Sequence, residues 1–129
     1  MSYFLLRSLP TGYKFDLKAS NGETVATSEV YDTVAACRKG MESVKKSAAS
    51  AKLEDRTEPA YQPCTNPRFE LYMDRSRNFR FRLRARNGKI IAVSESYSTK
   101  SACKNGIASV RRNAPTAVYS PEISPQEDS

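Results

Sequence analysis

The sequence repeats itself at a constant offset of 66 residues. Residues 15–48 align with residues 81–114 without a gap, and sixteen of the 34 aligned pairs are identical, including Asn21 with Asn87 and Gly40 with Gly106. A repeat of this kind indicates one supersecondary unit that is built twice. A unit of roughly 50–60 residues would bury only about 60% of its unfolded surface by itself. We therefore expect the two units to share a core within a single compact domain.

Each unit begins with strands that are joined by a tight hairpin. Residues 79–86 read Phe-Arg-Phe-Arg-Leu-Arg-Ala-Arg, the alternation of a half-buried strand, and residues 13–20 alternate in phase with them. Asn21-Gly22 and Asn87-Gly88 follow, and Asn-Gly is a strong hairpin signal because a type I′ turn needs positive φ at both central residues. Residues 23–27 and 89–93 are then the predicted return strands, and residues 3–7 and 69–73 the predicted first strands.

A helix is predicted to close each unit. In residues 98–112 either Ser98 or Thr99 can cap the start, and Arg111 and Arg112 stand at the end where the helix dipole favours cations. The first unit repeats this pattern. After each helix a tyrosine-containing piece, residues 59–61 or 116–119, is expected to add a fourth strand.

These elements divide the chain into two repeats. Residues 1–66 are the first repeat with a linker at 47–66, in which residues 47–58 are a polar linker or a frayed helix extension. Residues 67–119 are the second repeat. Residues 120–129 contain two prolines and three acidic residues and are predicted to be a disordered acidic tail.

Composition excludes several classes of site. The chain has no histidine, so it lacks the commonest general base and the commonest metal ligand, and Ser-His and Cys-His nucleophile pairs are excluded. The three cysteines form no Cys-x-x-Cys motif, and Cys37 and Cys103 are expected to be small buried helix residues. There is no apolar run of about 18 residues and no basic segment before the short apolar stretch at the start. We expect a cytoplasmic protein, and we predict no catalytic residue, no cofactor and no metal site.

Charge is shared unevenly between the two repeats. The chain carries a formal net charge of +7, but residues 1–66 carry only +1 whereas residues 67–114 carry +9. Two copies of one fold thus differ by about eight charges. Such asymmetry concerns partners and solubility rather than the fold.

The strongest candidate site is the row Arg80, Arg82, Arg84 and Arg86. Strand alternation predicts all four guanidinium groups on one face at intervals of about 6–7 Å, close to the spacing of phosphates along a nucleic-acid strand. A solvated sheet face that blocks edge aggregation would give the same pattern. The aromatic residues of this strand face the other side, which weakens the case for base stacking. The first repeat has Lys, Asp, Lys and Ser at these positions, so the fold itself does not need the row.

A second repeated pattern is Ser-Glu-x-Tyr, at Ser28–Tyr31 and Ser94–Tyr97. A carboxylate beside a phenol could serve acid–base chemistry. Because no histidine or other partner accompanies them, we interpret both copies as structural, with the glutamate bonding backbone amides near the helix start.

The run from Phe79 to Ala114 resembles the YegP-like family, a bacterial domain of unknown function. The resemblance rests on an aromatic strand entering an Asn-Gly turn, a Ser-Glu-x-Tyr segment, and a helix with Asn-Gly-Ile-x-Ser-Val-Arg-Arg-Asn. The first repeat departs from it at Lys39 and Met41, which replace the Asn and the Ile, and at Ser47, which replaces the last Asn. The resemblance implies tandem repeats or dimers of one-repeat chains, with C-terminal strands that exchange between the halves. It implies no activity, so it transfers no site.

The sequence thus predicts an α+β fold. Two tandem β-β-β-α(-β) repeats, related by a pseudo-twofold axis, form one antiparallel sheet on which both helices pack. We expect a monomer with an internal pseudo-dimer that acts as a non-enzymatic binding module for RNA, DNA or an acidic protein. The alternative is a structural or stress-related domain that recruits a protein by strand addition at an edge or at Tyr61 or Tyr119. A third reading is an enzyme or small-ligand binder at the interface between the repeats.

Overall fold

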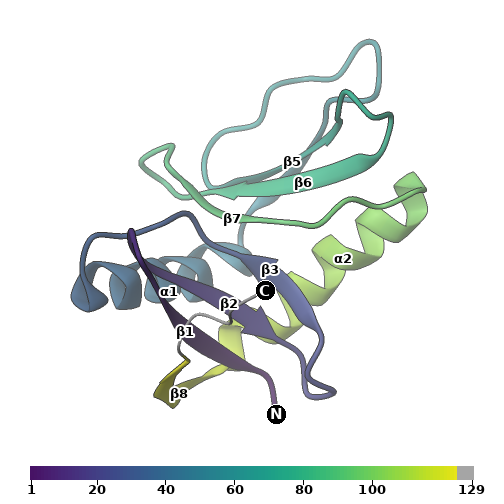
Figure 1. The fold of residues 1–129 in the computed structure, drawn as a ribbon. Helices are drawn as coiled ribbons and strands as arrows, with labels where there is room; N and C mark the ends of the chain where they lie inside the picture. Colours follow the sequence, from purple (N-terminus) through teal and green to yellow (C-terminus); the bar gives the residue numbers. More distant parts are fainter. Residues whose placement is uncertain (125–129) are drawn as a thin grey trace.

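The computed structural model describes residues 1–124, and of Glu122–Ser124 it describes the backbone alone. Its eight strands form one sheet and its two helices pack on one face of that sheet (Figure 1). The strands of the first repeat are β1 (Tyr3–Leu9), β2 (Gly12–Lys18), β3 (Thr24–Thr27) and β4 (Lys52–Asp55). Those of the second are β5 (Arg68–Met73), β6 (Phe79–Arg84), β7 (Ile90–Val93) and β8 (Val118–Ser124). The helices are α1 (Val34–Ala48) and α2 (Lys100–Asn113), and a short 3-10 turn (Ala114–Thr116) follows α2.

The sheet is mixed rather than wholly antiparallel. Its strand order is β4-β5-β6-β7-β3-β2-β1-β8, and the six inner strands pair antiparallel as expected. The two outermost strands, β4 and β8, run parallel to their neighbours. The two halves meet at β3 and β7, where Thr27 pairs with Val93.

The strands that follow the helices are exchanged between the repeats, as the family resemblance implied. β4 belongs to the first repeat but pairs with β5 of the second, and β8 belongs to the second but pairs with β1 of the first. Parallel neighbours cannot be joined by a tight turn and need a connection of about a dozen residues. Residues 56–67 supply that connection between β4 and β5.

This exchange corrects three predicted boundaries. The fourth strand of the first repeat is Lys52–Asp55, inside the stretch predicted to be linker, whereas residues 59–61 form no strand. β8 continues to Ser124, so the tail does not begin at 120, because residues 120–124 extend the strand alongside β1. The remaining tail, residues 125–129, lies outside the described residues.

The core lies between the sheet and the two helices. Each half contributes four fully buried phenylalanine and leucine side chains from its first two strands. The helices cover both halves: α1 contacts β2, β6 and β7, while α2 contacts β3, β5 and β6. Cys37 and Cys103 are buried in this layer, as predicted. The eight fully buried phenylalanine and leucine side chains are Phe4, Leu6, Phe15, Leu17, Phe69, Leu71, Phe81 and Leu83. Among the described residues, no helix is both long and apolar enough to cross a membrane.

The Ser-Glu-x-Tyr segments are structural, although the glutamate plays no part in capping. The Ser94 hydroxyl accepts a hydrogen bond from the Phe81 amide at 2.8 Å and donates one to the Glu95 carbonyl at 2.7 Å, and Ser28 does the same in the first repeat. The helices are capped by threonine: the Thr99 hydroxyl accepts from the Ala102 amide at 3.1 Å. The expected hydrogen bond from the glutamate to the helix start is therefore wrong: in both repeats a threonine hydroxyl accepts from the first turn, and neither Glu29 nor Glu95 does so.

Candidate functional site

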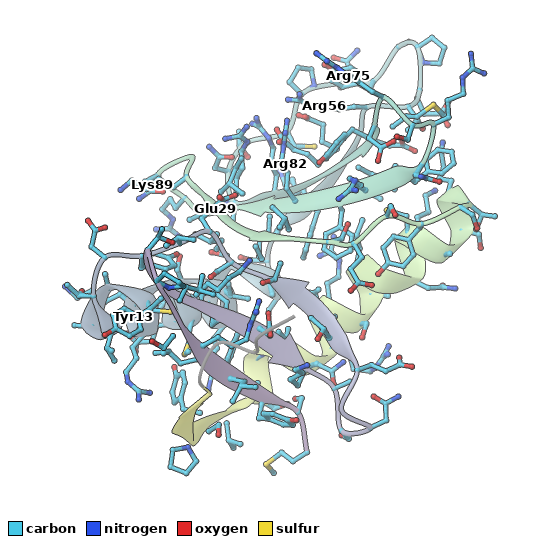
Figure 2. The ribbon with its side chains drawn as sticks, viewed as in Figure 1. Tyr13, Glu29, Arg56, Arg75, Arg82 and Lys89 are labelled. Carbon is cyan, nitrogen blue, oxygen red and sulfur yellow. The ribbon has the colours of Figure 1, made fainter. Side chains whose placement is uncertain are left out.

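Arginine side chains gather on the sheet face that lies opposite the helices, over β4, β5 and β6. In Figure 2 Arg56 and Arg82 lie on the side of β6 away from α2. Arg80, Arg82 and Arg84 project from β6 on this face, because the apolar residues between them point into the core. We call the group Arg56, Arg68, Arg80, Arg82 and Arg84 the arginine face.

Two carboxylates lie beneath these guanidinium groups. Glu54 of β4 and Glu70 of β5 are neighbours across the parallel pair, and their side chains are fully buried. Like charges opposite one another destabilise a sheet unless counterions separate them. The arginines supply those counterions: Glu70 contacts Arg56, Arg68, Arg82 and Arg84, and Glu54 contacts Arg56 and Arg68.

The individual distances show a shared network rather than separate pairs. Arg84 Nε donates to Glu70 Oε1 at 2.9 Å, and Arg56 donates from Nε to Glu54 at 2.6 Å and from Nη2 to Glu70 at 2.9 Å. Arg82 also donates from Nε to Glu70. Four guanidinium groups therefore share two carboxylates, and this cluster carries a net charge of two positive units.

The network fixes both carboxylates in their charged form. Burial by itself would raise the pKa of Glu70, but the hydrogen bonds from Arg82, Arg68 and Arg84 outweigh it and lower that pKa from 4.5 to about 2. Glu54 behaves alike: burial raises its pKa, and the bonds from Arg56 and the Cys64 amide lower it below its usual value.

The connection 56–67 closes one side of the cluster. The Cys64 amide donates to Glu54 Oε1 at 2.8 Å, and Arg68 Nη1 donates to the Cys64 carbonyl at 2.8 Å. The connection also brings Tyr61 to the arginine face, with its ring 5.8 Å from the Arg56 guanidinium carbon. The crossover thus supplies both a cover for the carboxylates and an aromatic ring.

Ion pairing occupies all three guanidinium nitrogens of Arg68 together with its bond to the Cys64 carbonyl, but it leaves part of the guanidinium groups of Arg80 and Arg82 free. Arg80 donates from Nε to Asp74 at 2.7 Å, and Arg82 likewise uses Nε, so the hydrogen bonds of both leave their terminal nitrogens available. The side chains of Arg80, Arg82 and Arg84 remain 40%, 25% and 25% exposed. Tyr72 lies on the same face, 4.8 Å from the guanidinium carbon of Arg82. The arrangement can offer a partner oriented N–H donors beside aromatic rings.

Arg86 does not belong to this face, which corrects the predicted row of four. β6 ends at Arg84, and the pairing of β6 with β7 shifts register between Leu83 and Arg84. Arg86 lies in the turn beyond the strand, where it is exposed and lines a pocket against α1. Strict alternation over eight residues therefore overestimated the strand by two.

Sequence reasoning missed the acidic half of this site. Glu70 stands in the run Arg-Phe-Glu-Leu-Tyr, residues 68–72, whose alternation places Arg68, Glu70 and Tyr72 on one face. That signal was readable, whereas the approach of Glu54 and Arg56 depends on the strand exchange. Among the side chains that the structure describes, no three of His, Cys, Asp or Glu are grouped so as to hold a metal ion.

Comparison with known proteins places this geometry in a family. Residues 11–55 and 74–119 match the family described as Domain of unknown function (DUF1508). A UPF0339 protein of Treponema denticola is 58% identical over 50 residues, which are 39% of this chain and 86% of that one. The UPF0339 protein YegP of Yersinia pestis is 40% identical over 106 residues, 82% of this chain and 81% of that one.

A solved structure extends the likeness to the whole fold. The solution NMR structure of yegP from E. coli, a protein of unknown function, superposes with a TM-score of 0.77 at 28% identity and covers 98% of this chain and 96% of that one. With two copies of the domain in sequence and one shared fold, the chain belongs to the DUF1508 family of uncharacterised UPF0339 proteins.

Proposed function

We propose that this protein is a non-enzymatic binding module whose arginine face binds a polyanion, with single-stranded nucleic acid as the partner. The observation that carries the proposal is the excess of guanidinium groups over carboxylates on one half-exposed face. Arginine recognises phosphate through paired N–H donors, and its planar group also stacks on bases. Oriented guanidinium groups lose little freedom when they bind.

Aromatic rings on the same face favour a nucleic acid as the partner over a protein with an acidic surface. Tyr72 and Tyr61 both lie beside arginines of the cluster, and Tyr61 is 39% exposed. Stacking of bases on aromatic rings is worth about 1–3 kcal/mol per base in single-strand binders. At the turn between β5 and β6, Arg75 and Arg77 are exposed and add positive charge to this end of the sheet.

The two repeats provide a matched test. Replacing Arg80 and Arg84 by Gln removes two charges from β6 but leaves Glu70 with Arg56, Arg68 and Arg82. The control replaces Lys14 and Lys18, which occupy the equivalent positions of β2, and removes the same two charges from the other half. Fluorescence anisotropy with a labelled single-stranded oligonucleotide, at several salt concentrations, then measures affinity.

We expect the wild type to bind with an affinity that falls as salt rises, with a slope of about 0.7 for each phosphate contact. The Arg80→Gln/Arg84→Gln variant should bind more weakly and with a shallower slope, while the control should retain most of the affinity. If both variants lost the same affinity, net charge alone would explain binding and the arginine face would not be the site. No binding by the wild type at low salt would contradict the proposal.

The second candidate is recruitment of a protein by strand addition. It is favoured by β8, which ends the strand order and exposes Val118 and Tyr119 at 45% and 40%. A partner held there would remain bound to the Arg80→Gln/Arg84→Gln variant and would be released by a charged residue at Val118.

A further inference from the structure

The structure contains two grooves that are related by the pseudo-twofold axis. Each lies between the hairpin turn of one repeat and the helix of the other. The first groove is formed by the β2–β3 turn and α2, the second by the β6–β7 turn and α1, and each has a volume of about 510 Å³. The offset of 66 relates Ser109 of the first to Ser43 of the second, and Arg112 to Lys46. This volume is within the usual range for small-molecule sites, roughly 300–1,000 Å³.

The second groove offers hydrogen-bond donors and no carboxylate. Its polar lining consists of three hydroxyls, two cations and one amide, from Ser43, Lys46, Ser47, Ser50, Arg86 and Asn87. Among the described side chains, those of residues 1–121, none forms a hydrogen bond with the three hydroxyls or an ion pair with the two cations. The Asn87 oxygen already accepts from the Lys89 amide at 3.0 Å, so its NH₂ group remains as a donor. The uncommitted groups of this groove therefore suit an anion.

The first groove differs in its lining although its volume is the same. Ser20 stands in place of Arg86, and Glu23 lines the groove. Asn113, the counterpart of Ser47, donates to the Ser109 carbonyl at 2.8 Å and to the Ser109 hydroxyl at 3.0 Å. In the first groove Arg112 is therefore balanced by Glu23, and part of the polar lining is already hydrogen-bonded. The second groove is the better candidate for an anion site.

We propose that the second groove binds the phosphate group of a small organic phosphate. Phosphate presents several acceptor oxygens to cations and hydroxyls, and the arginine fork matches them in pairs. Pro67 and Ala85 complete the lining and offer apolar surface to the carbon part of the ligand. This site is separate from the arginine face, because α1 packs on the opposite side of the sheet from that face.

The test uses the full chain and amide NMR spectra at constant ionic strength. The probes are inorganic phosphate and glycerol 3-phosphate, with glycerol and sodium chloride as controls. We expect saturable shifts in the amides of residues 43–50 and 85–88 with both phosphates and with neither control. The corresponding amides of the first groove, 19–25 and 109–113, should move little.

Substitutions then separate a site from general charge. Arg86→Ser copies the first groove, and with Lys46→Gln it should weaken binding about tenfold or more, the effect of losing charge-assisted hydrogen bonds. Arg112→Gln, the equivalent change in the first groove, should leave affinity unchanged. Absence of saturable shifts, or equal loss in the Arg112→Gln control, would overturn the proposal. The Arg80→Gln/Arg84→Gln variant should still bind phosphate, so failure of one proposal is distinguishable from failure of the other.

Discussion

At the scale of single residues, Glu70 decides how the arginine face is built. A fully buried carboxylate is costly unless its charge is paired and its oxygens are bonded. Here four arginines from two strands and the crossover converge on it. The same contact that orients each guanidinium also neutralises part of its charge. Glu70 therefore holds the guanidinium groups in fixed positions, and at the same time it reduces the net positive charge of the arginine face.

Replacing Glu70 by Gln should destabilise the protein by about 3 kcal/mol, because breaking a buried ion pair leaves uncompensated charge. Since the folded pKa of Glu70 is about 2 against 4.5 ordinarily, its contribution is complete above the higher value and is lost as pH falls toward the lower. Urea denaturation at several pH values measures both effects. In the Glu70→Gln variant the free energy of unfolding should fall less steeply between these two pH values, because the titrating carboxyl is absent. Asp74→Asn, at the exposed pair with Arg80, is the control and should change stability less.

At the scale of elements, each helix is positioned by a glycine that meets a tyrosine. A Cβ on Gly106 would lie 2.9 Å from Tyr97 Cζ and 3.0 Å from Phe81 Cε2. The Tyr97 ring is itself stacked on Phe81, with ring centroids 6.4 Å apart, so it has little room to move. Gly40 and Tyr31 repeat the contact in α1. The mid-helix glycine thus allows close approach of helix and sheet.

Gly106→Ala should therefore destabilise the protein, although alanine is favoured over glycine in a helix by about 1 kcal/mol. Overpacking costs typically about 1–3 kcal/mol, and the helix propensity of alanine offsets about 1 kcal/mol of that cost, so a net loss of up to about 2 kcal/mol is expected. Chemical denaturation gives the value. Asn105→Ala, at the exposed neighbouring position, supplies the control and should be neutral or slightly stabilising. A stabilised Gly106→Ala protein would refute the close contact.

At the scale of the whole molecule, neither repeat completes its own sheet. β4 covers the edge of β5 and β8 covers the edge of β1, so each half depends on a strand from the other. The stack of Phe4 on Tyr119, with centroids 5.9 Å apart, crosses the same boundary. The Treponema denticola relative, matched over 86% of its length by 50 residues, has room for one such repeat only.

Fragments 1–58 and 59–129 should consequently fail to behave as folded monomers. The first fragment contains β4 but lacks β8, which covers the edge of β1, and the second contains β8 but lacks β4, which covers the edge of β5. We therefore expect each fragment alone to self-associate, with two copies exchanging these strands. Light scattering after size exclusion measures the mass. An equimolar mixture should give a one-to-one complex with the circular dichroism of the intact chain. Folded, monomeric fragments would contradict the dependence.

The sequence by itself determined the local elements. Hairpins, helices and caps depend on neighbours a few residues apart, so Asn87-Gly88, Thr99 and the alternation of residues 79–84 predicted them directly. The expected type I′ turn was wrong, because only the glycine of each Asn-Gly pair has a positive φ. The internal repeat also indicated a shared core. Where alternation was extended beyond the strand, at Arg86, the prediction of a common face was wrong.

Only the tertiary structure decided which strands pair with each other and which carboxylates the arginines contact. β4 is four residues long and carries Lys52, Glu54 and Asp55, so its pattern is that of a polar linker; pairing with β5 makes it a strand. Burial of Glu54 and Glu70 likewise requires strands distant in the sequence to meet. Long-range pairing leaves no local periodicity, and for that reason the approach of Glu54 and Arg56 to Glu70 could be found only in the fold.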